Sequence, residues 1–408
     1  LNMSIHSNLI NIDGSARQND SFRNTNFTNM YVGGYFGLIE REANALRMNL
    51  SLQGIERINS SNDENQRVTV SHASATNAYI AGYIGYNHGL DTLTLQSNFT
   101  GGVDVYLNDT SSATSSFTTL HTGIIFGRAD NTNVNAINFN SARFDGGLYV
   151  VQNSGSENNV TITSLYAGGY AGSLGSSMTI TNLSELNYEI VALSSASSGV
   201  SEISKDTLDS NDYASNTLTL GTANTVGTVK AGVVVGSTNA YFSMGADLTR
   251  LNANGESFRF VGISDDSAIG SVLGETTATS LAELRNNTVN ITSGVVSYAQ
   301  FVIIVSGDID DSPAVGGIIG SVYKTDTTGS GNSISRVNVG AQNSSYVAFN
   351  GAVYSNISNI TFGGIIGETN FTSASDTVSL INTSFGGMLK VYGANSQGGD
   401  VIAGGLVG

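Results

Sequence analysis

Residues 31–37 read Tyr-Val-Gly-Gly-Tyr-Phe-Gly, and variants of this glycine motif recur along the whole chain. In each copy, glycines or other small residues flank a short apolar or aromatic stretch, and the copy closes on glycine. The copies lie at 31–37, 79–85, 123–127, 166–172, 232–236, 270–274, 314–320, 361–367 and 401–408. They return about every 45 residues, a period typical of architectures built by stacking repeats.

Two further segments lie between successive glycine motifs, and both have the strand signature of alternating apolar and polar residues with many β-branched side chains. Examples of the first are 48–52, 92–95, 134–139 and 178–181. Examples of the second are 103–107, 147–151, 258–261, 346–349 and 389–392. Polar turns join the segments, so each repeat is expected to contribute three strands.

This pattern predicts an all-β fold, a parallel β-solenoid (β-helix) of about eight to nine imperfect coils, because one coil alone cannot bury its inward face. We expect one continuous domain over 1–408, with a loop insertion around 194–216, where the step between two closing glycines is long. Glycine suits tight corners because it lacks a Cβ and adopts backbone angles closed to other residues. The single proline, Pro313, precedes a glycine motif, where it removes no ladder hydrogen bond. The best candidate for a helix is short, at 276–286.

The amino-acid composition argues against several classes of function. The net charge is −16 and the basic residues are scattered, which argues against nucleic-acid binding. Cysteine is absent, so disulfides and thiolate chemistry are excluded. No apolar run approaches the roughly 18 residues of a membrane span. Charged residues make up only 12% of the chain, and Asn, Ser and Thr supply most of the polar positions, so we expect an extracellular or cell-surface location.

The form Gly-Gly-Leu-Val-Gly at 404–408, with Gly-Gly-Ile-Ile-Gly at 316–320 and 363–367, resembles the GLUG-motif repeats of bacterial and some protist surface proteins and adhesins. The resemblance implies a β-solenoid with an attachment or scaffold role. It covers essentially the whole chain at low stringency. The repeats are longer here than the usual family unit, and several central glycines are replaced or offset.

Residues able to carry catalysis are few. The four histidines, His6, His72, His88 and His121, are far apart and lack metal-ligand spacing, so each is interpreted as a turn or surface residue. Ser321-Val-Tyr-Lys324 matches a Ser-x-x-Lys pattern, but no matching Lys-Thr-Gly follows it. We therefore predict no catalytic, cofactor-binding or metal site, and no enzyme activity.

Calcium is the one cofactor that the sequence leaves open. Carboxylates and amides gather at 307–311 and 130–133, and such turns can hold Ca²⁺ loosely, although neither fits an EF-hand loop and a solvated turn is the favoured interpretation. Thr-x-Thr pairs at 92/94, 161/163, 179/181 and 217/219 skip coils, which disfavours an ice-binding face.

Asn-x-Ser/Thr sequons are frequent, and in a secreted eukaryotic protein several would carry glycans. The candidate sites are Asn26, Asn49, Asn98, Asn108, Asn159, Asn182, Asn290, Asn356, Asn359, Asn370 and Asn382.

The predicted function is a non-catalytic structural or adhesive component of an extracellular fibre, filament or stalk. The expected partners are copies of itself or neighbouring repeats, with carbohydrate or a host or cell-surface ligand as a further option, and neither nucleic acid nor a membrane span is expected. Two alternatives stay open: a carbohydrate-active β-helix enzyme and an inert spacer. Because neither end of the sequence carries an evident cap, we also expect the 408 residues to be a section of a longer repetitive protein or a subunit that stacks end to end.

Overall fold

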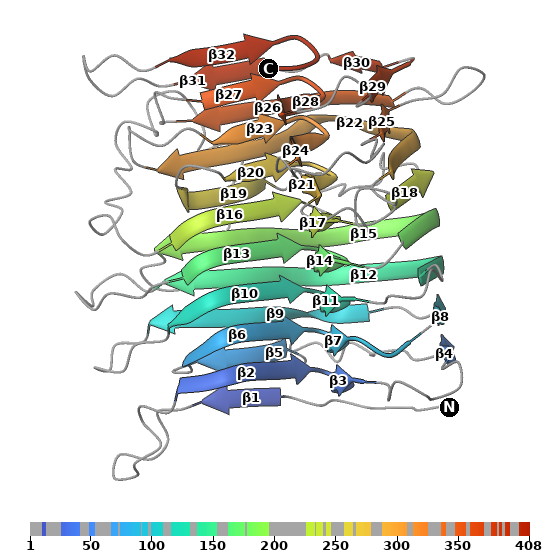
Figure 1. Cartoon of the computed structure of the whole chain (residues 1–408), viewed down its shortest axis with the longest axis vertical. Coiled ribbons are helices and arrows are strands. Elements are labelled where there is room, and N and C mark those ends of the chain that lie inside the picture. Colours follow the sequence, from blue (N-terminus) through green and yellow to red (C-terminus); the bar gives the residue numbers. More distant parts are fainter. Residues whose placement is uncertain are drawn as a thin grey trace, which may run out of the picture.

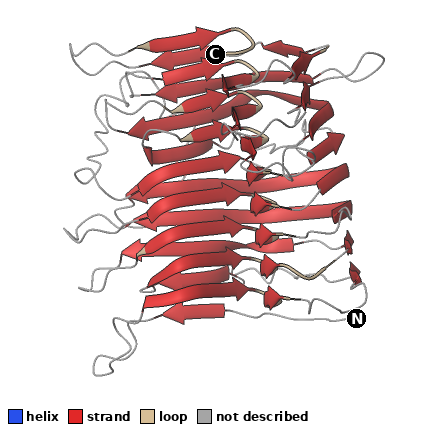
Figure 2. Cartoon of the chain, viewed as in Figure 1, coloured by secondary structure: helices blue, strands red, loops and turns tan. Residues whose placement is uncertain are grey.

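The computed structural model shows a stack of parallel strands that rises from the N-terminus at one end to the C-terminus at the other (Figure 1). It describes residues 10–13, 26–40, 49–53, 67–71, 74–90, 92–96, 99–108, 116–130, 137–152, 162–175, 178–195, 226–232, 234–239, 242–245, 257–263, 267–278, 288–307, 313–324, 336–339, 347–355, 360–370, 377–381, 383–385, 388–391 and 400–408. This part of the chain is all-β and contains no helix (Figure 2). The predicted fold class, a parallel β-solenoid, is confirmed.

Two sheets are built directly by the glycine motifs. Sheet B has nine strands in the order of the chain: β2 (Asn26–Gly33), β6 (Ser74–Ala81), β10 (Phe117–Gly123), β13 (Ile162–Gly168), β16 (Val226–Gly232), β20 (Ala268–Gly270), β23 (Ala314–Gly316), β27 (Ile360–Gly363) and β32 (Val401–Gly404). Sheet C has eight: β3 (Phe36–Ile39), β7 (Ile84–Asn87), β11 (Phe126–Ala129), β14 (Ala171–Leu174), β17 (Val235–Thr238), β21 (Leu273–Ala278), β24 (Ile319–Lys324) and β28 (Ile366–Asn370). Each of the first eight motifs therefore ends a strand of sheet B and begins the neighbouring strand of sheet C, and the ninth ends β32.

Sheet A, with 15 strands, forms the third side of the solenoid. It contains β1 (Ile10–Asp13), β4 (Asn49–Gln53), β5 (Arg67–Ser71), β8 (Thr92–Gln96), β9 (Phe99–Asn108), β12 (Ile137–Gln152), β15 (Met178–Ser195), β18 (Phe242–Gly245), β19 (Ser257–Ile263), β22 (Thr288–Gly307), β25 (Arg336–Val339), β26 (Val347–Ser355), β29 (Thr377–Leu380), β30 (Thr383–Phe385) and β31 (Met388–Val391). The two alternating segments of a repeat lie in this one sheet. They are joined in the long strands β12, β15 and β22, and in the other repeats they remain separate, shorter strands.

The corner between sheets B and C is two residues long. Corners of successive coils, which we call rungs, are hydrogen-bonded to one another. Tyr83 N donates to Ile124 O at 3.0 Å, and Val234 N donates to Val272 O at 3.2 Å. Ile365 N continues the series to Leu406 O at 2.9 Å. The glycine motifs thus lie directly above one another, as the repeat pattern predicts.

The closing glycine of each motif lies where the backbones of sheets B and C touch. A Cβ on Gly236 would meet Gly172 O at 2.5 Å and Lys230 O at 2.7 Å, and one on Gly127 would meet Gly85 O at 2.6 Å. These contacts are with backbone atoms, which cannot turn aside. None of the closing glycines has a left-handed φ, so close approach, rather than unusual backbone angles, requires glycine at this position.

The core follows the same corner. The second residue of the corner is fully buried in seven successive rungs: Tyr83, Ile125, Tyr170, Val234, Val272, Ile318 and Ile365. Burying each such side chain contributes about 1.5–3 kcal/mol. The stack of corners is therefore apolar inside, and backbone hydrogen bonds hold it together along its length.

Two local expectations have different outcomes. Pro313 lies just before β23, outside the strand, as predicted. The helix expected at 276–286 is wrong at its start, because Thr276 to Ala278 belong to β21 and pair with β24. The neighbouring strand β24 supplies the hydrogen-bonded partner for these residues, with Thr276 opposite Val322. Residues 279–286, and most of the insertion expected around 194–216, lie outside the described residues.

Replacing a closing glycine is expected to destabilise the solenoid strongly. Gly236→Ala inserts a methyl group between two backbones and should lower the free energy of unfolding by about 3 kcal/mol, at the upper end of overpacking effects. Gly405→Ala is the matched control, since a Cβ on Gly405 would meet nothing within 4 Å. Urea denaturation followed by circular dichroism measures both. Equal midpoints for the two variants would contradict the backbone-contact argument.

Candidate functional site

Side chains of unlike chemistry stack in register where sheets B and C meet; we call this set the polar ladder. Sheet B contributes Tyr31, Tyr79, His121, Tyr166 and Lys230, which are direct partners in the strand register. Sheet C contributes Tyr86, Arg128, Ser173 and Glu275, and His88 and Asp130 follow its strands β7 and β11. The ladder is a direct consequence of parallel stacking, because equivalent positions of successive repeats must lie one above the other.

The aromatic part of the ladder is a continuous stack of rings. Centroids of Tyr31 and Tyr79 lie 5.3 Å apart, those of Tyr79 and His121 5.1 Å, and those of His121 and Tyr166 4.6 Å. Tyr86 adds a further ring, 4.8 Å from Tyr79. Tyr79 and His121, inside the stack, have rings on both faces, so these aromatic side chains stabilise the contact between neighbouring rungs.

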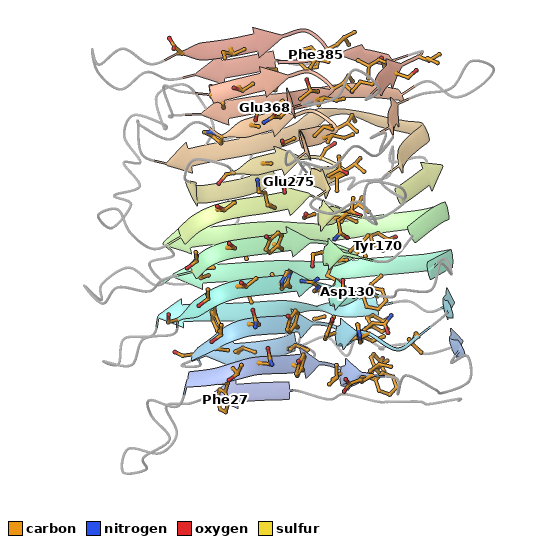
Figure 3. The ribbon with its side chains drawn as sticks, viewed as in Figure 1. Phe27, Asp130, Tyr170, Glu275, Glu368 and Phe385 are labelled. Atoms are coloured by element: carbon orange, nitrogen blue, oxygen red, sulfur yellow. The ribbon has the colours of Figure 1, made fainter. Side chains whose placement is uncertain are left out.

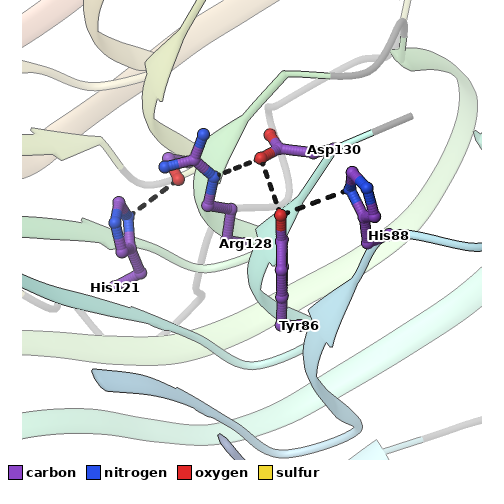
Figure 4. A network of polar contacts seen from close by, with 6 residues as sticks. Tyr86, His88, His121, Arg128 and Asp130 are labelled. Carbon is purple, nitrogen blue, oxygen red and sulfur yellow. Dashed lines mark hydrogen bonds and ion pairs between the residues drawn. The ribbon is translucent and has the colours of Figure 1, made fainter. Parts of the chain in front are cut away.

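A network of polar contacts joins two rungs beside this stack (Figure 4). Asp130 Oδ2 accepts hydrogen bonds from Arg128 Nε at 2.6 Å and from Tyr86 Oη at 3.1 Å. Tyr86 Oη also lies 3.3 Å from His88 Nδ1. Burial and then the Asp130 carboxylate raise the pKa of Tyr86, so it stays a neutral donor.

Arg128 is the cation of this network. Burial alone would lower its pKa, but the Asp130 carboxylate and its hydrogen bond, with Tyr79 and Tyr86, raise the pKa overall. The second oxygen of the carboxylate, Asp130 Oδ1, is buried without a hydrogen-bond partner. It lies against Gly175 of the next rung, where a Cβ would collide with it. Glycine at 175 therefore leaves room for the carboxylate.

His121 is buried inside the ring stack, and the interpretation of it as a turn or surface residue is wrong. Its exposed fraction is 3%, and Nδ1 lies 2.8 Å from Ser173 Oγ. Burial, and then the nearby Arg128, hold its pKa well below the ordinary value of 6.5. The available signal was the alignment of repeats, which places His121 at the same position as Tyr79 and Tyr166.

The Ser173–His121 contact has the elements of a nucleophile and a base, but its surroundings oppose that chemistry. A general base must become cationic, and both burial and Arg128 disfavour an imidazolium. Its ring faces are covered by Tyr79 and Tyr166. The arrangement is suited to holding a neutral imidazole in the stack.

Above the rings, the ladder changes to a buried ion pair. Lys230 Nζ donates to Glu275 Oε2, and each residue is 8% exposed. Glu275 comes from sheet C and Lys230 from sheet B, so the pair connects the two sheets across successive rungs (Figure 3 labels Glu275). Burial, followed by Glu275, raises the pKa of Tyr166 in the rung below.

The other predicted site residues have separate places. His88 is exposed in the bend after β7, as expected, and His6 and His72 lie outside the described residues. Ser321 and Lys324 lie in strand β24, so the Ser-x-x-Lys pattern does not sit on a helix. Of the calcium candidates, Gly307 and Asp130 are described and the rest of both turns is not. Within the described part of the chain, His, Asp and Glu form no group of three able to hold a metal ion.

Among the candidate glycosylation sites, Asn370 is the one whose side chain is described, and it is exposed at the end of β28. Asn26, Asn49, Asn108, Asn182 and Asn290 lie in strands, without a description of their side chains. The remaining sites, Asn98, Asn159, Asn356, Asn359 and Asn382, lie outside the described residues.

Comparison with known proteins finds no matching family model, no similar curated protein and no similar solved structure. The resemblance to GLUG-motif repeats therefore rests on the residues quoted for it and stays a prediction. Among the described residues, no helix has the length and apolar character to span a membrane.

His121 is expected to make stability pH-dependent. The unfolded chain takes up a proton on this histidine below about pH 6.5, whereas the folded chain resists it, so the free energy of unfolding falls as pH drops from 6.5. His121→Tyr, which copies the rungs on either side, should flatten this slope by up to about 1.4 kcal/mol per pH unit. Thermal unfolding between about pH 7 and pH 5 measures it. A wild-type slope in H121Y would contradict the assignment.

The ion pair predicts a non-additive pair of substitutions. Glu275→Leu leaves Lys230 buried without its carboxylate and should cost about 3–5 kcal/mol. The double variant Lys230→Met/Glu275→Leu removes both charges and should recover most of that loss, since apolar replacements of buried pairs are often neutral. Chemical denaturation of the two single variants and the double variant tests this. Additive losses would show that the pair is not coupled.

Proposed function

We propose that this chain is a non-catalytic structural or adhesive component of an extracellular fibre, filament or stalk. The observation that carries the proposal is the continuous parallel ladder, in which backbone hydrogen bonds and stacked side chains run unbroken from rung to rung. Such a stack is stable through contacts between neighbouring rungs and can be extended without a new core. An elongated rigid body of this kind suits a scaffold.

The use of polar side chains supports the non-catalytic part of the proposal. Asp130 and Glu275 are engaged by Arg128 and Lys230. They belong to rungs three steps apart in sheet C, which is about 14 Å along the stack. The two carboxylates of a glycosidase are usually about 5–9.5 Å apart. These two paired carboxylates thus lack the spacing that the enzyme alternative needs.

Exposed apolar side chains support association with further rungs. The large ones among the described residues are Phe27, Leu38, Val401, Ile402 and Leu406, and all belong to the first or last rungs of sheets B and C (Figure 3 labels Phe27). Neighbouring repeats, or copies of the chain, fit these surfaces.

A combined binding and turnover assay tests the proposal. Purified chain is sedimented with fixed cells and with extracellular-matrix polysaccharides, and the supernatant is analysed for soluble oligosaccharides. The expected result is protein in the pellet and no sugar release. Release of oligosaccharides would support the enzyme alternative, and recovery of all the protein in the supernatant would support an inert spacer.

A further inference from the structure

The outer face of sheet B carries a file of identical exposed side chains. Thr28, Thr76, Thr118 and Thr163 occupy the same position in four successive strands, β2, β6, β10 and β13, and all four are exposed. The register of the preceding residues fixes this alignment. Phe27 pairs with Ala75, Ala75 pairs with Phe117, and Phe117 pairs with Ile162. We call these four residues the threonine file.

A second file runs beside it. Its members are Asn29, Asn77, Thr119, Ser164 and Thr228, which are paired in register from β2 to β16. Asn77 Nδ2 donates to Asn29 Oδ1 at 3.0 Å, so amides of adjacent rungs hold each other in place. Both files consist of uncharged side chains that carry hydroxyl or amide groups.

The two files form a neutral strip on a chain with a net charge of −16. A threonine side chain has a restricted χ1, and stacking at about 4.8 Å per rung sets its hydroxyls at regular intervals. Four rungs therefore cover about 14 Å along the solenoid. An extended ligand with repeating hydroxyl groups and no charge matches this strip, whereas a polycation or polyanion gains nothing from it.

We propose that the threonine file and its neighbouring file bind a linear, neutral polysaccharide that lies along the solenoid axis. This inference rests on the proposed adhesive function and assigns it a surface and a ligand class. Recognition is by hydrogen bonds, because both files present only hydroxyl and amide groups. The strip is separate from the polar ladder, which occupies the later residues of the same strands.

The test uses the triple variant Thr76→Val/Thr118→Val/Thr163→Val. Valine keeps the β-branched shape and removes the hydroxyl, and all three positions are exposed, so folding should be preserved. The protein is made in a bacterial host, so that no N-glycan at Asn26 covers the strip. Binding is measured by affinity electrophoresis and pull-down with neutral polysaccharides (cellulose, chitin, β-glucan and mannan), and with heparin and alginate as charged polymers.

The wild type should bind at least one neutral polysaccharide, and the triple valine variant should bind it about tenfold or more weakly, since several hydrogen bonds of about 0.5–1.5 kcal/mol are lost. The corresponding triple serine variant keeps the hydroxyls and should bind within about threefold of the wild type. Thr361→Val, in β27, makes the same chemical change away from the strip and should leave binding unaltered.

Each other outcome overturns the inference in a distinguishable way. If the triple valine variant binds as tightly as the wild type, adhesion stands but this surface is wrong. If the wild type binds only heparin or alginate, the ligand class is wrong. Retention by ice alone, measured by ice-affinity partitioning, would replace the polysaccharide by a water lattice. A wild type that binds no polysaccharide and no cell surface contradicts the adhesive function as well.

Discussion

The contact between two backbones at the closing glycine is the constraint on which the rest of the structure depends. At Gly127 and Gly236, the strand of sheet C lies so close to sheet B that a single Cβ would collide with carbonyl oxygens of its own rung and of the rung before it. The corner can therefore be as narrow as two residues, and the second of these, such as Ile125 or Val234, turns into the core. Repetition of this corner sets the register of every later strand.

A fixed register determines what kind of site the fold can offer. Residues at equivalent positions are held about 4.8 Å apart, so a side chain must be compatible with the same position in the rungs above and below. The polar ladder meets this requirement in two ways, with ring on ring from Tyr31 to Tyr166 and with opposite charges at Lys230 and Glu275. Both solutions satisfy side chains within the stack. Groups that could serve a chemical reaction, above all His121 and Ser173, are instead used to hold neighbouring rungs together.

The sequence predicted the structure correctly where a residue's role depends on its position in the repeat. The glycine motifs predicted stacked corners, alternation predicted the strands of sheet A, and Pro313 was correctly placed outside the ladder. The burial of His121 was missed because histidine was assessed alone, without aligning it with Tyr79 and Tyr166. The threonine file has no Thr-x-Thr signature of the kind that marks an ice-binding strand, because it is formed by one threonine from each of four strands. The contact between Asp130 and Gly175 depends on side-chain packing between rungs, which no local pattern contains.

The N-terminal and C-terminal halves of each early strand in sheet B consequently have different roles. Its later residues pack into the polar ladder, where burial and stacking leave little freedom to change. Its earlier residues, Thr76 and Asn77 in β6 and their equivalents, face outward and are restricted mainly by alignment with adjacent rungs. Substitution there costs little stability, because exposed positions lose few contacts. The outer strip can therefore vary in sequence while the corner and the polar ladder preserve the stack, and this separation is the physical basis of the proposed adhesive function.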